Sequence, residues 1–61
     1  MANLTTKELT AVSEQLEAES VLIAKYRQYA QTTNDIGLRT QFEAIASKHC
    51  QHFDTLYRLL G

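Results

Sequence analysis

The sequence predicts an all-α protein: two long helices folded into an antiparallel hairpin, half of a four-helix bundle that a second copy completes. Three observations predict this fold class. The 61 residues include no proline and only two glycines, so little interrupts a helix. Turn-forming residues cluster once, at 32–37, between two arms of similar length. Each arm carries an unbroken heptad pattern of mainly apolar side chains.

The first helix is expected to span residues 6 to about 31. Thr5 and Glu8 have the spacing of a capping box, in which each side chain accepts a hydrogen bond from the backbone N–H of the other. Leu4 and Leu9 occupy the positions of a hydrophobic staple on either side of this cap. Helix-favouring residues then continue to Gln31.

The turn is expected at about residues 32–37, and the second helix at about 38–60. Asn34 or Asp35 is suited to cap this second helix. Equal arms and a short loop predict antiparallel neighbours within a single helical-hairpin domain, residues 1–61.

Three polar residues interrupt the two heptad seams. The seams run through Leu9, Val12, Leu16, Glu19, Ile23, Tyr26 and Ala30, and through Leu38, Phe42, Ile45, His49, His52, Leu56 and Leu59. The exceptions are Glu19, His49 and His52. They lie about 15 to 18 residues from the turn on their two helices, which places them within one helical turn of the same height. One carboxylate and two imidazoles should therefore converge in an apolar core.

Two interpretations of this polar layer remain open. In the first, Glu19 pairs with one or both histidines in a hydrogen-bonded network that fixes register, as polar seam residues do in coiled coils. In the second, Glu19, His49 and His52 bind a metal ion, because two histidines and a carboxylate form the ligand set of zinc and non-haem iron sites. Cys50, beside His49, is expected to be a free thiol toward the outer side; the alternative is a fourth ligand.

Chain length makes a partner or a metal necessary. A chain of 61 residues has little room for a core, and its one cysteine cannot form an internal disulfide. Further apolar residues widen both seams, namely Leu22, Tyr29, Ala46, Phe53 and Leu60. Faces of this width favour a four-helix bundle formed by a twofold pair. We therefore expect a homodimer with its partner along this stripe.

Charge and hydropathy exclude two classes of partner. Six Lys and Arg against seven Asp and Glu give a net charge of −1, without the basic excess that binding to nucleic acids requires. No apolar run approaches the roughly 18 residues of a membrane span, and the N-terminus lacks a signal-peptide pattern. Synthesis in the cytoplasm is expected, with neither nucleic acid nor membrane as partner. The other charged side chains, Arg27 and Arg39 among them, are expected to form a solvated face.

Residues 17–20, 26–30, 42–46 and 49–53 are similar to the first two helices of ferritin-like and rubrerythrin-like proteins. The resemblance implies that Glu19 is the metal ligand of the first helix and that His52 is the histidine of the Glu-x-x-His pair of the second. His49 stands where that superfamily has a glutamate. This departure argues against ferroxidase chemistry and favours a histidine-rich site for zinc, iron or copper.

Over residues 4 to 60 the chain also resembles the short spore coat proteins of the Coat F domain family. The similarity lies in Tyr29-Ala30 and in the run Ile-Ala-x-x-His-x-x-His-Phe from Ile45 to Phe53. It implies a sporulation-linked structural protein of ferritin-like fold in the spore coat, with other coat proteins as further partners. The function expected first is thus structural or assembly-related, without catalytic residues. The alternative is a metal-binding protein with a storage or redox role.

Overall fold

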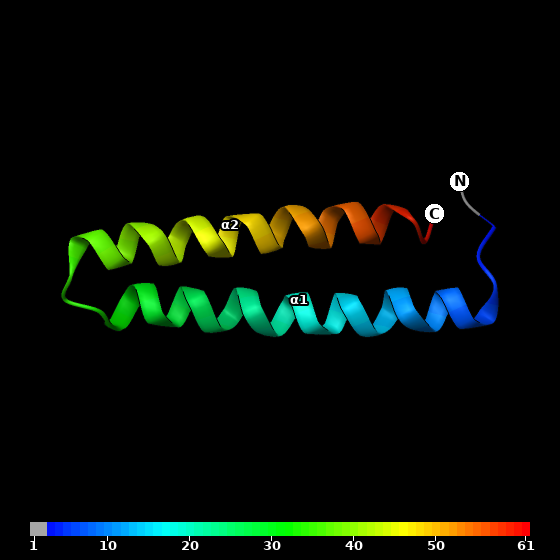
Figure 1. Ribbon diagram of the computed structural model, residues 1–61, viewed down its shortest axis with the longest axis horizontal. Helices are drawn as coiled ribbons and strands as arrows, with labels where there is room; N and C mark the ends of the chain where they lie inside the picture. Colours follow the sequence, from blue (N-terminus) through cyan, green and yellow to red (C-terminus); the bar gives the residue numbers. More distant parts are fainter. Residues whose placement is uncertain (1–2) are drawn as a thin grey trace.

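Two antiparallel helices joined by a short turn form the described chain, as the sequence predicts (Figure 1). The computed structural model describes residues 3–61, so the first two residues of the expected domain lie outside the described residues. Helix α1 spans Thr6–Thr32 and helix α2 spans Ile36–Arg58. The hairpin is elongated, at 46 × 16 × 11 Å, and the start of α1 lies at the same end as the end of α2.

The start of α1 confirms the predicted capping box. The Thr5 hydroxyl accepts a hydrogen bond from the Glu8 N–H at 3.1 Å, and the Glu8 carboxylate accepts one from the Thr5 N–H at 2.9 Å. Hydrogen bonding of the Glu8 carboxylate to the Thr5 backbone N–H, and then to the Thr5 side chain, lowers the pKa of Glu8. These bonds satisfy N–H groups that have no partner within the helix.

Helix α2 begins and ends about two residues earlier than expected. Asp35 is the N-cap, since its carboxylate accepts a hydrogen bond from the Leu38 N–H at 2.8 Å, and the helix therefore starts at Ile36. At the other end, the Leu59 and Leu60 N–H groups bond to carbonyls three residues back, so regular α-helix stops at Arg58.

Arg39, on α2, donates hydrogen bonds to carbonyl groups at the C-terminal end of α1. Its Nε donates to the Ala30 carbonyl at 3.1 Å and its Nη2 donates to the Thr33 carbonyl at 3.0 Å. Both carbonyls belong to the end of α1, where helix geometry provides no N–H partner. Arg39 is exposed, as expected of the solvated face, and its long side chain also spans the gap between the helices.

Helix α2 is rotated relative to the predicted seam. Ala46 is 4% exposed and packs toward α1, although the sequence placed it on the stripe for a partner. Leu38 and Leu59, both predicted seam residues, are 48% and 39% exposed. Arg39 and Ala46 lie seven residues apart on one helical line, and this line faces α1, since Ala46 is buried and Arg39 donates to carbonyls at the end of α1. The line of Leu38 and Leu59 is thereby turned toward solvent.

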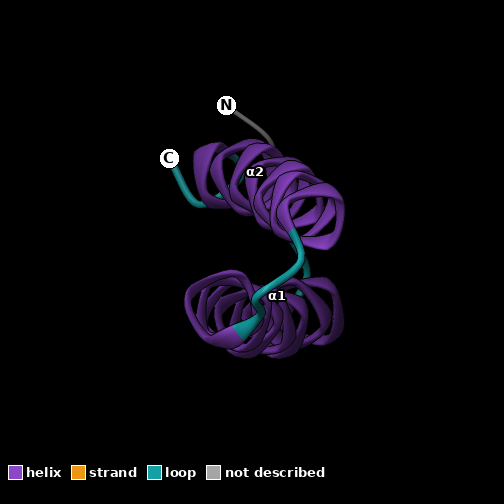
Figure 2. Ribbon diagram, turned by 90° about the vertical axis from the view of Figure 1, so that its left-hand side faces the viewer, coloured by secondary structure: helices purple, strands orange, loops and turns teal. Residues whose placement is uncertain are grey.

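Burial between the two helices is slight. Among the described residues only Glu19, Ala30 and Ala46 are buried. Seen end on, α1 and α2 lie side by side without any further element of residues 3–61 covering the flanks of the pair (Figure 2). Within this part of the chain, neither helix is both long enough and apolar enough to cross a membrane.

Candidate metal centre

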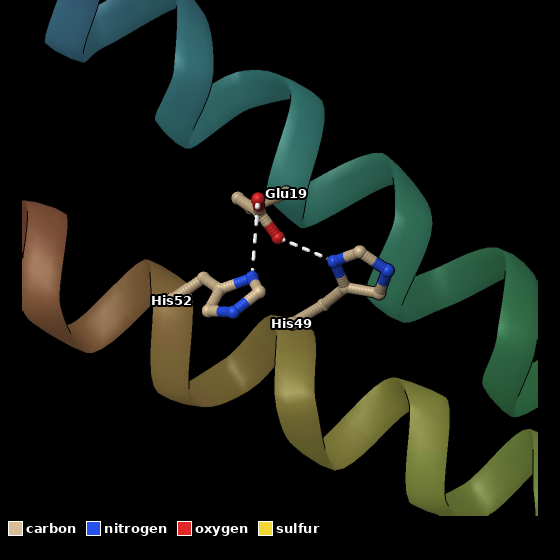
Figure 3. A group of neighbouring side chains, drawn as sticks. All are labelled: Glu19, His49 and His52. Carbon is tan, nitrogen blue, oxygen red and sulfur yellow. Dashed lines mark hydrogen bonds and ion pairs between the residues drawn. The ribbon is translucent and has the colours of Figure 1, made fainter.

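The structure brings Glu19, His49 and His52 together, as the seam positions predict (Figure 3). Glu19 is the middle residue of α1, and the two histidines lie one turn apart on the facing side of α2. One ligand atom from each residue lies within 4.8 Å of the other two. Among the described residues this is the cluster of metal-ligating side chains that the fold assembles.

Both imidazoles present Nδ1 to the same carboxylate (Figure 3). His49 Nδ1 lies 2.6 Å from Glu19 Oε2, which is a short hydrogen bond, and His52 Nδ1 lies 3.7 Å from Oε1. The exposed fraction increases from 7% for the Glu19 side chain to 22% for His49 and 61% for His52. The site is therefore closed at the carboxylate and open to solvent at His52.

A fourth residue, Gln15, completes the surroundings of the carboxylate. Its side-chain amide donates to Glu19 Oε1 at 3.1 Å. No buried side-chain nitrogen or oxygen in residues 3–61 lacks a partner, so the hydrogen-bonded layer of the first interpretation is present. Gln15 is not among the residues that the sequence predicts for this site. The spacing of Gln15 and Glu19 could have predicted this hydrogen bond, because residues four apart on a helix are neighbours and a glutamine can donate to a carboxylate there.

The charge of Glu19 is retained despite its burial. Desolvation is the largest influence and raises the pKa of this carboxyl group. The hydrogen bonds from His49 and Gln15, together with the charges of His49 and His52, outweigh desolvation and hold the pKa below its ordinary value of 4.5. A carboxylate at neutral pH is the form that binds metal ions.

The hydrogen bond to Glu19 orients the His49 ring. When neutral, His49 carries its proton on Nδ1 and keeps the Nε2 lone pair free. The Tyr26 ring stacks on this imidazole, with centroids 6.1 Å apart and planes 15° apart. Tyr26 thus packs against the site, as expected of an aromatic residue on the seam. The His52 ring lies edge to face with the His49 ring, with centroids 5.7 Å apart.

Cys50 lies outside the cluster. Its thiol is free and half-buried, and its Sγ accepts a contact from Arg27 Nη2 at 3.6 Å. Arg27, an exposed residue of the expected solvated face, therefore also touches the facing helix. The two side chains, Arg27 and Cys50, line one shallow hollow of the hairpin together with Phe53.

The donor set is compatible with a transition-metal ion. Zinc at about 2.0–2.1 Å from tetrahedral ligands requires ligand atoms about 3.3 Å apart. The two Glu19–His distances, 2.6 Å to Oε2 and 3.7 Å to Oε1, lie on either side of that spacing, and the three ligand atoms lie within 4.8 Å of one another. The ion would replace the proton that His49 donates to Glu19, and the imidazole would then carry its proton on Nε2.

Comparisons of the chain with known protein families, with curated proteins and with solved structures find no match. The resemblance to ferritin-like and Coat F proteins thus stays a prediction. The function has to be argued from the geometry of the cluster and from the surface around it.

Proposed function

We propose that this chain is a metal-binding helical hairpin in which Glu19, His49 and His52 bind a divalent transition-metal ion. The observation that carries the proposal is the convergence of three ligand atoms within 4.8 Å around a buried carboxylate. A carboxylate that is 5% exposed and retains its charge is unusual, because burial of a charge costs several kcal/mol unless partners compensate it.

The ligand types narrow the choice of ion. Two imidazoles and one carboxylate suit zinc, iron or copper, whereas calcium and magnesium prefer sites made of oxygen ligands. Three protein ligands leave coordination positions open, which is the arrangement of sites that exchange or store an ion or bind an exogenous group. Because the imidazole nitrogens must be deprotonated to bind, zinc affinity should decrease as the pH falls.

The decisive test is elemental analysis of the natively purified chain, followed by zinc titration of the metal-free protein. We expect stoichiometric metal, and we expect His52→Ala to weaken zinc binding by roughly tenfold or more. EDTA should lower the melting temperature of the wild type, since metal binding is coupled to folding. Gln51→Ala, an exposed neighbour outside the cluster, is the matched control and should bind zinc as the wild type does.

Absence of stoichiometric metal, together with a melting temperature that EDTA leaves unchanged, would refute the proposal. The layer would then act as a hydrogen-bonded network that fixes the register of the helices. The satisfied bonds of Glu19 support that function independently of any metal.

A structural or assembly role is the second candidate function. It is supported by the large apolar side chains that remain exposed, which a lone hairpin leaves in water. Under this proposal the chain is a building block of a homodimeric four-helix bundle, and the spore coat is the assembly that its resemblance implies. Recovery of the chain in the coat fraction of spores would test that location.

A further inference from the structure

We infer that Gln15 is a positioning residue of the candidate metal centre: its side-chain amide holds the Glu19 carboxylate toward the ion without binding the ion itself. This inference rests on the proposed function, because it describes how a ligand of that site is held. It adds to the site a residue that belongs to neither histidine nor carboxylate ligands.

Two hydrogen bonds hold the Glu19 carboxylate, one at each oxygen. Gln15 Nε2 donates to Oε1 at 3.1 Å, and His49 Nδ1 lies 2.6 Å from Oε2. His52 Nδ1 lies 3.7 Å from Oε1, which is too long for a direct hydrogen bond. Among the described residues, Gln15 is therefore the neighbour that bonds to the carboxylate without being a candidate ligand.

Metal binding should affect these two hydrogen bonds differently. An ion that binds His49 Nδ1 and Glu19 Oε2 replaces the proton between these two atoms, so that hydrogen bond is lost. The bond from Gln15 involves the other oxygen, and its amide nitrogen is a donor that offers no lone pair to a cation. In the metal-loaded chain Gln15 would thus remain as the partner that fixes the carboxylate.

Gln15 orients the carboxylate from within α1. It lies four residues before Glu19 on the same helix, and side chains at this spacing are neighbours on the helix surface. The hydrogen bond therefore needs no contact with α2, and the carboxylate is held whichever way the two histidines are turned. A ligand that is ordered before binding loses less conformational entropy when the ion binds.

A glutamine has the chemistry that this role requires. Its amide donates a hydrogen bond but carries no charge, so the carboxylate keeps its full negative charge for a cation. Lysine or arginine at this position would pair with Glu19 and repel the ion. Because Glu19 is only 5% exposed, its oxygens depend on donors from the protein rather than on water.

The test is a double-mutant cycle on zinc affinity, measured by titration of the metal-free chain. Gln15→Met keeps the helix propensity and approximate length of the side chain but removes the donor. We expect it to weaken zinc binding by roughly tenfold or more, which is the usual cost of losing a hydrogen-bond partner of a metal ligand. Gln28→Met, the same change at an exposed glutamine of α1 outside the cluster, should bind zinc as the wild type does.

The Glu19→Gln background separates positioning from a general effect on the helix. In that background zinc is left with His49 and His52, and Gln15 has no carboxylate to hold. The zinc affinities of Glu19→Gln with and without Gln15→Met should therefore agree within about twofold. If the full loss of affinity persists in that background, Gln15 does not act through Glu19, and the inference is overturned.

A second variant and a spectroscopic measurement support the cycle. Gln15→Ala serves if Gln15→Met fails to fold, since alanine favours a helix more than glutamine does, and it should weaken zinc binding similarly. In nuclear magnetic resonance spectra of the isotope-labelled, zinc-loaded wild type, one side-chain amide proton of Gln15 should resonate downfield of those of Gln28, because it donates to a carboxylate. Coinciding resonances would show that the bond is not kept and would contradict the inference.

The outcomes separate this inference from the proposed function. If the wild type binds zinc and both Gln15 variants bind it as tightly, the inference is overturned and the proposed function stays intact. A wild type that binds no zinc would overturn both, and the titration of the wild type alone would reveal it.

Discussion

Glu19 occupies a seam position where the heptad would otherwise place an aliphatic side chain. Its neighbours satisfy the carboxylate: Gln15 donates to one oxygen and His49 to the other. Removal of a single donor from a buried carboxylate leaves an uncompensated polar group, which costs more than the bond itself contributes. The layer is therefore stable only as a set, with or without a metal ion.

The pH dependence of stability should report on Glu19. Because its pKa is lower in the folded chain than the ordinary value of 4.5, folding is favoured by the ionised form. This contribution is present above pH 4.5 and is lost as the pH falls through the lower folded pKa. Glu19→Gln should lack this part of the acid destabilisation, which urea unfolding of metal-free protein between pH 6 and pH 3 would measure.

The control for this measurement is Glu17→Gln, an exposed carboxylate on the same helix. The free energy of unfolding of the Glu17→Gln variant should decrease between pH 6 and pH 3 as steeply as that of the wild type. If Glu19→Gln loses stability between pH 6 and pH 3 as steeply as Glu17→Gln, the carboxylate of Glu19 does not contribute as the structure indicates.

At the level of elements, the N-caps determine where the helices begin, and a side chain of α2 bonds to the free carbonyls at the end of α1. Thr5 and Asp35 cap α1 and α2. The position of Thr5 is readable from sequence because capping depends on residues within one turn, whereas the sequence offered Asn34 or Asp35 for the second cap and the structure selects Asp35. Arg39 differs, since it bonds to carbonyls of the other helix, at Ala30 and Thr33. That contact exists only after the hairpin has closed.

Asp35→Ala should destabilise the hairpin by about 1 kcal/mol, because it removes the acceptor of the Leu38 N–H at the first turn of α2. For a chain of this size that corresponds to a decrease of about 4–8 °C in melting temperature. Thermal unfolding followed by circular dichroism would measure it. Asn34→Ala is the matched control, because no hydrogen bond of residues 3–61 involves the Asn34 side chain, and it should melt close to the wild type.

As a whole, the molecule is an elongated pair of helices with a thin core. Ala30 and Ala46 are its only buried apolar residues in the described part of the chain. Folding costs about 1–2 kcal/mol of conformational entropy per residue. The burial of two alanine side chains stabilises the hairpin by much less than that total. Stability should therefore come from association, which links folding to chain concentration.

The melting temperature should rise with protein concentration. A tenfold increase contributes about 1.4 kcal/mol per dimer, which for a pair of these chains corresponds to roughly 5 °C. Scanning calorimetry across a hundredfold concentration range measures the shift. A monomer that folds on its own would show no dependence on concentration.

The sequence alone determined the features that depend on neighbours along the chain. The helices, the turn, the Thr5 cap and the convergence of Glu19, His49 and His52 follow from local propensity and from equal arms about one turn. For the second cap, the sequence left Asn34 and Asp35 both open. Only the tertiary structure decided how α2 is rotated. In the folded hairpin the line of Arg39 and Ala46 faces α1, while the His52 side chain is left 61% exposed beside the cluster. A heptad pattern specifies which residues are apolar, but contacts between residues far apart in the chain decide which of them face the other helix.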